Sequence, residues 1–220
     1  MEVKALLLDM DGTILGTEEV WNMSIIYAND HLGVNVPKDF CIKNIGTTLQ
    51  QKYEKLLPYL NGTGVTPQDY CNCQKEWKEN YIMQNGVCVR RGYKSLVKYA
   101  KQNKIKLALV TSASAESVFF NFNYANLNLL NFDAVITKES VTNIKPNAEP
   151  YKKAMQQLRL KPMQCVAVED SSIGITSAIS ANAVAVFAKG TSVLNGTLED
   201  KVAYKINDFN DLISWLKNSQ

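Results

Sequence analysis

The stretch that decides the fold is VKALLLDMDGT, residues 3–13. Its first six residues, 3–8, form an almost wholly apolar run, which is typical of a central parallel strand covered on both faces. Asp9 and Asp11 follow at once, and Gly12 allows the chain to turn. Ligands of open parallel sheets bind outside the carboxyl ends of the strands. The stretch therefore predicts a buried sheet with a polar site at its edge.

Further apolar runs of strand length recur along the chain, and helical patterns lie between them. We expect strands at 106–110, 134–136, 165–168 and 183–187, and helices at 93–102, 150–158, 171–181 and 209–216. Alternation of strands with helices predicts an α/β fold with a doubly wound parallel sheet.

Residues 17–90 interrupt this alternation. Their patterns predict helices at 18–31, 48–57 and 66–82, with little strand signal. We interpret 17–90 as an inserted α-helical domain, and 1–16 together with 91–220 as the α/β core domain.

Composition excludes several classes of protein. The chain has 220 residues, of which 46% are hydrophobic, as in ordinary globular proteins. Its net charge of +3 comes without a basic run, so we expect no nucleic-acid partner. The first apolar run is too short and too acidic for a signal peptide or membrane span. The five cysteines lack a disulfide framework, so we expect reduced thiols in a cytoplasmic protein. We also expect a monomer without membrane contact.

Polar side chains follow the ends of three predicted strands. They are Asp9 and Asp11 after the first strand, Ser112 after 106–110, and Glu169 and Asp170 after 165–168, with Lys145 in a loop before Pro146. Each alone is typical of a helix cap or a turn. Together, four carboxylates at one sheet edge would repel one another unless a cation lay among them. Because the chain has a single histidine and no zinc-type cysteine spacing, the oxygen ligands favour Mg²⁺.

These residue types suit phosphoryl transfer. Asp9 can act as a covalent nucleophile, and Asp11 can handle the proton of the leaving group. Mg²⁺ would lower the repulsion between that nucleophile and the phosphoryl oxygens. Ser112, backbone N–H groups and Lys145 could hold the remaining oxygens, and Gly12 lets the backbone come close.

Four segments resemble, in order and spacing, the motifs of the haloacid dehalogenase superfamily. They are DMDGT at 9–13, VTSAS at 110–114, Lys145-Pro146, and VEDSSIG at 168–174. The resemblance covers the whole chain, and four ordered motifs are far more specific than any one of them. Residues 17–90 resemble the helical cap domain of the subgroup that contains β-phosphoglucomutase and sugar-phosphate phosphatases.

The resemblance implies a role for each acidic residue. Asp9 would be nucleophile and metal ligand. Asp11 would be general acid and then general base, and its carbonyl would also bind the metal. Asp170 would bind Mg²⁺, and Glu169 would support it or bind directly.

The resemblance also implies how the phosphate is held. Ser112 and the Ala113 N–H would bind it, Gly12 would let the backbone approach it, and Lys145 would neutralise its charge. The cap would close over the substrate and contribute specificity residues.

Three positions depart from the mutase pattern. Trp21 stands where the mutase has a histidine, Leu49 stands near the place of its phosphate-binding arginine in the segment 46–49, and Gly16 replaces a common aspartate. The first two favour a Mg²⁺-dependent phosphomonoester hydrolase acting on a small phosphorylated metabolite, such as a sugar or polyol phosphate. The alternatives are a β-phosphoglucomutase-like sugar phosphomutase and a catalytically silent phosphometabolite-binding protein. Asp11 argues against dehalogenation, which needs no second acid.

Overall fold

The protein forms two compact units. A computed structural model describes residues 2–44, 49–190, 193–194 and 196–218. The core unit comprises Met1–Gly16 and Cys88–Gln220, and the helical unit comprises Thr17–Val87. Each unit has its own buried apolar core.

The returning chain joins the core unit three residues before the predicted start at 91. The Gly16 N–H donates to the Cys88 carbonyl at 2.9 Å, and the Arg90 N–H donates to the Ile14 carbonyl at 2.9 Å. These bonds pair the outgoing and returning segments of the chain, and an antiparallel bridge between Leu15 and Val89 completes the pairing. Residues 88–90 therefore lie against the loop that follows the first strand.

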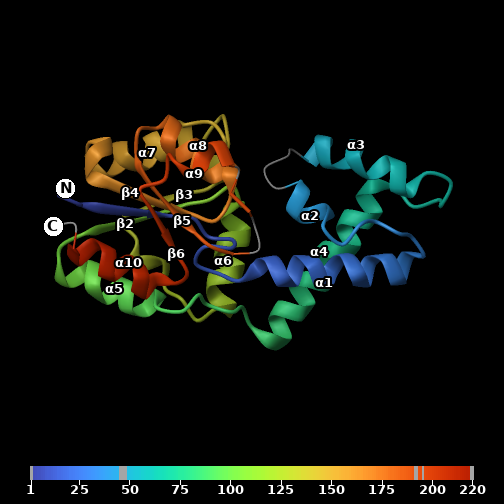
Figure 1. The fold of residues 1–220 in the computed structure, drawn as a ribbon. Coiled ribbons are helices and arrows are strands. Elements are labelled where there is room, and N and C mark those ends of the chain that lie inside the picture. The colour runs from blue at the N-terminus through green and yellow to red at the C-terminus, as the bar shows by residue number, and fades with distance from the viewer. Residues whose placement is uncertain (1, 45–48, 191–192, 195, 219–220) are drawn as a thin grey trace. The chain divides into compact units, whose positions relative to one another are not determined.

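A six-stranded parallel sheet forms the centre of the core unit in the described part of the chain (Figure 1). Its strands are β1 (Ala5–Leu8), β2 (Lys106–Val110), β3 (Ala134–Ile136), β4 (Cys165–Glu169), β5 (Val184–Ala188) and β6 (Tyr204–Ile206). The predicted doubly wound α/β sheet is confirmed. The sequence does not predict β6, because this short edge strand has one exposed, one half-buried and one buried residue and so lacks a continuous apolar run.

The strand order is β3-β2-β1-β4-β5-β6. The chain builds outward from β1 through β2 to β3, and then returns to the other side of β1 with β4. The gap between the carboxyl ends of β1 and β4 is thus a topological switch point, where open α/β sheets bind ligands. Because Leu8 pairs with Val168, the next residues, Asp9 and Glu169, are brought side by side.

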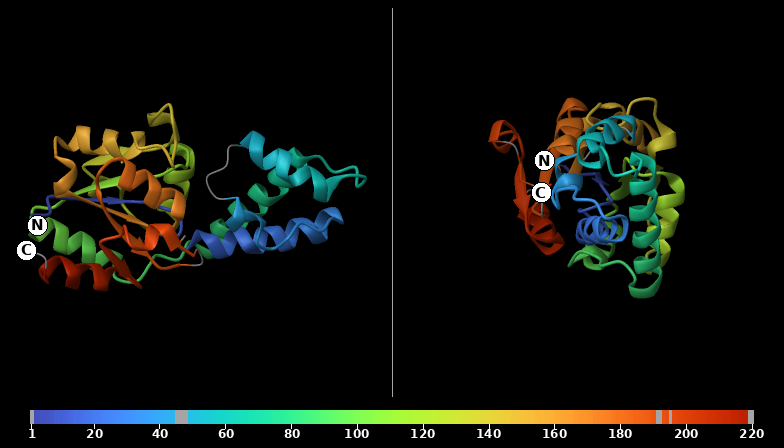
Figure 2. Two further views of the ribbon diagram at one scale, coloured as in Figure 1. Left: turned by 45° about the horizontal axis from the view of Figure 1, so that its top comes forward. Right: turned by 90° about the vertical axis from the view of Figure 1, so that its right-hand side faces the viewer.

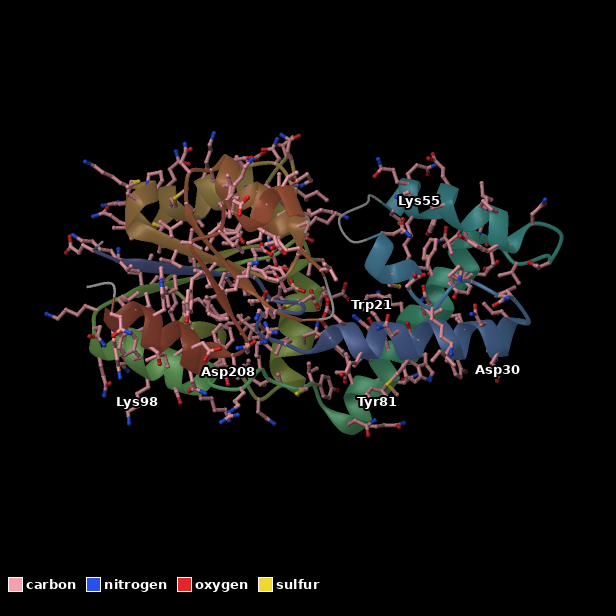
Figure 3. The ribbon with its side chains drawn as sticks, in the orientation of Figure 1. Trp21, Asp30, Lys55, Tyr81, Lys98 and Asp208 are labelled. Atoms are coloured by element: carbon pink, nitrogen blue, oxygen red, sulfur yellow. The ribbon has the colours of Figure 1, made fainter. Side chains whose placement is uncertain are left out.

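Helices cover both faces of the sheet (Figures 1 and 2). They are α5 (Tyr93–Gln102), α6 (Ala115–Tyr124), α7 (Glu149–Leu158), α8 (Ser172–Ser180), α9 (Gly196–Glu199) and α10 (Phe209–Asn218), with short 3₁₀ turns at Leu129–Asn131, Lys138–Ser140 and Pro162–Gln164. Helices α7 and α8 lie on one face, and α5 and α10 lie on the other. Helix α5 buries Tyr93, Leu96 and Ala100, while Lys98 points away from the sheet (Figure 3). This periodicity explains why the predicted 93–102 helix matches the structure.

The helical unit consists of α1 (Thr17–Leu32), α2 (Phe40–Lys43), α3 (Leu49–Leu60) and α4 (Pro67–Asn85). Helix α4 begins with a capping box in which Thr66 and Asp69 bond each other's backbone N–H groups. Helix α3 continues through Pro58, past its predicted end at residue 57. Residues 46–48 lie outside the described residues. They belong to the segment compared with the mutase and include the predicted start of the 48–57 helix. Among the helices that the structure describes, none is long and apolar enough to cross a membrane.

Candidate active site

Three acidic side chains meet at the switch point between β1 and β4. Asp9 follows β1, Glu169 is the last residue of β4, and Asp170 comes next. Carboxylate oxygens from the three lie within 4.8 Å of one another, and all three residues are buried. The sequence predicts them at the ends of two strands, and the parallel pairing of those strands brings them together.

Lys145 lies within this acidic cluster. Its ammonium is 2.6 Å from Asp9 Oδ1 and 2.5 Å from Glu169 Oε1, and it donates to the Val110 carbonyl at 2.7 Å. Just after its cis bond to Pro146, the Asn147 carbonyl accepts a hydrogen bond from the buried Ser177 hydroxyl of α8. The loop is thus attached to the helix that follows β4.

The cluster shifts the ionisation of its members. Burial raises the pKa of Asp9 to about 8, the positive charge of Lys145 opposes that shift, and the negative charge of Glu169 adds to it. Burial alone would lower the pKa of Lys145, but the carboxylates of Asp9 and Glu169 outweigh it and raise that pKa. Lys145 therefore stays charged. A divalent cation beside Asp9 would favour the ionised carboxylate, which is the nucleophilic form.

The loop after β1 turns back on itself directly beyond Asp9. Gly12 has a φ of +76°, a left-handed conformation that glycine adopts at little cost. The N–H groups of Ile14 and Leu15 donate to the Met10 carbonyl at 2.9 and 3.0 Å. The Thr13 hydroxyl donates to Asp170 Oδ1 at 3.4 Å, which connects this loop with the end of β4.

The second predicted phosphate-binding segment follows β2, the other neighbour of β1. Ser112 and Ala113 are half-buried there. The Ala113 N–H donates to the Thr111 hydroxyl at 3.0 Å, and the Thr111 N–H donates to the Ile136 carbonyl at 2.9 Å. Thr111 thus holds this turn, and the phosphate contacts of Ser112 and Ala113 stay predictions.

Sequence reasoning missed the contacts that two residues make with Glu169. The buried Tyr151 hydroxyl of α7 donates to Glu169 Oε1. Burial, and then the charge of Glu169, raise the pKa of Tyr151 well above its usual value, so the phenol keeps the proton that it donates. At Gly174 in α8, an added Cβ would lie only 1.8 Å from Glu169 Oε2. The sequence marks Gly174 as part of a motif, but neither residue carries a local signal of its contact with Glu169.

The donor set fits a magnesium ion. Its atoms are carboxylate oxygens, the hard ligands that Mg²⁺ prefers, and the cluster includes neither histidine nor cysteine. One ammonium balances the charge of one carboxylate, and a divalent cation would balance the other two. Asp9, Glu169 and Asp170 could therefore hold the ion. Asp11 lies close enough for its charge to raise the pKa of Asp9 further.

The chain is similar to known proteins over most of its length. The family model of haloacid dehalogenase-like hydrolases matches residues 6–188. The pyrophosphatase PpaX of Bacillus mycoides (strain KBAB4) is 24% identical over 219 residues, which cover 97% of this chain and 98% of the relative.

Solved structures share the fold. CbbY from Rhodobacter sphaeroides, in complex with xylulose 1,5-bisphosphate, superposes with a TM-score of 0.76 at 22% identity over 96% of each chain. The β-phosphoglucomutase from Clostridium difficile superposes with a TM-score of 0.74 at 22% identity over 98% of this chain and 96% of that one.

The fold and the family model define an α/β enzyme of the hydrolase class. Because the family model spans most of the sequence, the chain belongs to the haloacid dehalogenase-like hydrolase family. The resemblance drawn from its four motifs is thereby confirmed.

Proposed function

We propose that this protein is a Mg²⁺-dependent phosphomonoester hydrolase that acts on a small phosphorylated metabolite, such as a sugar or polyol phosphate. One observation carries the proposal. The Asp9 carboxylate lies at the switch point 2.6 Å from a buried ammonium and beside two further acidic side chains. A nucleophile for phosphorus and the charges needed to hold a cation are thus gathered at the edge where the fold binds ligands.

The proposed reaction has two steps. In the first, a carboxylate oxygen of Asp9 attacks phosphorus, the bond from phosphorus to the ester oxygen breaks, and Asp11 gives its proton to the departing oxygen. In the second, Asp11 takes a proton from water, and the water oxygen attacks phosphorus. The bond from phosphorus to the Asp9 oxygen breaks, which releases inorganic phosphate and restores the Asp9 carboxylate. Bound Mg²⁺ would supply positive charge for the nucleophile and the phosphoryl oxygens.

The remaining residues are assigned by position. Lys145 keeps its charge within the cluster and neutralises part of the negative charge that gathers when a phosphate enters. Ser112 and the Ala113 N–H are proposed as phosphate donors from the end of β2, and Gly12 provides backbone access. The role of residues 17–90 as a cap that selects the substrate is also a proposal, supported by the family resemblance.

The test is hydrolysis of p-nitrophenyl phosphate with Mg²⁺ by the wild type and by Asp9→Asn. The amide cannot attack phosphorus, so we expect Asp9→Asn to lose turnover while its circular dichroism stays native. Asp200→Asn, at an exposed position, is the matched control and should keep wild-type activity. Turnover by Asp9→Asn within tenfold of wild type would refute the mechanism.

A phosphate-release panel then addresses the substrate. It should contain hexose phosphates, polyol phosphates, phosphoglycolate and nucleoside monophosphates. Inorganic pyrophosphate belongs in it as well, because one full-length relative is named as a pyrophosphatase. Preference for pyrophosphate over all the monoesters would replace the sugar-phosphate proposal.

A further inference from the structure

The carboxylate of Glu169 is bonded at one oxygen and closely packed at the other. Oε1 accepts from the Tyr151 hydroxyl and lies 2.5 Å from the Lys145 ammonium. Oε2 lies against the backbone of α8, in the space that a side chain at position 174 would occupy. A glutamate has several rotatable bonds, so a carboxylate held in this way has lost freedom that an unsupported one would keep.

Tyr151 belongs to a different element from Glu169. It lies on α7, is fully buried, and is 18 residues from Glu169. The Lys145 ammonium is 5.4 Å from the centre of the Tyr151 ring. Tyr151 therefore lies beside both members of the ion pair between Lys145 and Glu169. A phenylalanine would fill nearly the same volume, and the hydroxyl is therefore the part of Tyr151 that acts on Glu169.

The same protein offers a comparison. Tyr93, in α5, is also buried, yet its hydroxyl has no hydrogen-bond partner among the described residues. Burial of a tyrosine in this core thus does not by itself require a bonded hydroxyl. The bond from Tyr151 to a carboxylate in the acidic cluster is a specific contact.

We propose that Tyr151 is a positioning residue whose hydroxyl fixes the Glu169 carboxylate in the orientation that completes the divalent-cation site. The inference rests on the proposed function in so far as the acidic cluster binds a metal ion. Groups that hydrogen-bond to metal-binding carboxylates orient them, and losing such a partner typically weakens metal affinity or activity 10- to 100-fold. Tyr151 would thus set metal affinity without touching the substrate.

The test compares metal binding in Tyr151→Phe and Tyr93→Phe. Mn²⁺ binding followed by electron paramagnetic resonance, and Mg²⁺ binding by calorimetry, report affinity without turnover. We expect Tyr151→Phe to bind both ions about 10- to 100-fold more weakly, and Tyr93→Phe to match the wild type. In phosphatase assays, Tyr151→Phe should need more Mg²⁺ for half-maximal rate. At saturating Mg²⁺, its KM for p-nitrophenyl phosphate should return to the wild-type value.

A double-mutant cycle shows whether the hydroxyl acts through Glu169. In a Glu169→Ala background, Tyr151→Phe should cause no further loss of metal affinity. The proposal would be overturned if Tyr151→Phe lowered metal affinity equally in both backgrounds. It would also be overturned if Tyr151→Phe left the affinity unchanged or did not fold. A wild type that binds no divalent ion would overturn it too. A wild type that binds Mn²⁺ but releases no phosphate from any ester would overturn the proposed function alone.

Discussion

Replacing Gly174 by alanine tests how firmly Glu169 is held. The new Cβ would lie 1.8 Å from Oε2, 2.0 Å from Cδ and 2.4 Å from Oε1 of Glu169. The end of a flexible side chain could normally retreat to the 3.4 Å of an ordinary contact. Glu169 cannot do so freely, because Oε1 is bonded to Tyr151 and paired with Lys145 at 2.5 Å.

The structure sets the expected magnitude. Moving the carboxylate away separates a buried ion pair, which costs about 3–5 kcal/mol when one partner is left uncompensated. Alanine in place of glycine within a helix returns about 1 kcal/mol. The net loss of unfolding free energy should therefore be about 2–4 kcal/mol. For a chain of this size, that corresponds to a decrease in Tm of roughly 4–16 °C.

Thermal unfolding followed by circular dichroism measures this change. Gly196→Ala is the matched control, because among the described residues nothing lies within 4 Å of the Cβ added to this helical glycine. The Tm of this variant should stay the same or rise. In a Glu169→Ala background the obstacle is gone, so Gly174→Ala should then cost less than about 1 kcal/mol. A Tm for Gly174→Ala at or above that of the wild type would refute the reasoning.

Two further predictions concern the reaction. Turnover should require Mg²⁺, disappear in EDTA and be inhibited by Ca²⁺. Inhibition is expected because Ca²⁺ takes more ligands at longer distances and would misplace Asp9. Full activity in metal-free protein would contradict the proposed cation. Glucose 1-phosphate, if it reacts, should yield glucose and inorganic phosphate. A mutase must bind a second phosphate, and residues 17–89 contain no arginine that could bind it in a bidentate manner. A coupled glucose-6-phosphate dehydrogenase assay beside a phosphate-release assay decides this, and isomerisation faster than phosphate release would favour the mutase alternative.

Local sequence pattern predicted the interior of the sheet well. The runs that became β1, β2 and β4 are apolar except for Lys106 at the start of β2 and Glu169 at the end of β4, because central parallel strands are buried on both faces. Elements at the margin were harder to predict. The local pattern did not predict β6 or the helix α6, and it placed the end of α3 before Pro58, which the helix includes. Edge strands and proline-containing helices depend on neighbours distant in sequence, which no short window contains.

The sequence by itself determined the class of fold and the residues from which a site could be built. Asp9, Lys145, Glu169 and Asp170 could be selected because strand ends and motif spacing are local properties of the chain. Only the tertiary structure decided how they meet, since the order of the strands brings Asp9 beside Glu169, and the loop before α7 places the Lys145 ammonium between them. It alone showed the contact of Tyr151 with Glu169, because that contact depends on how α7 packs against the sheet, and the packing of a helix is a sum over many distant side chains.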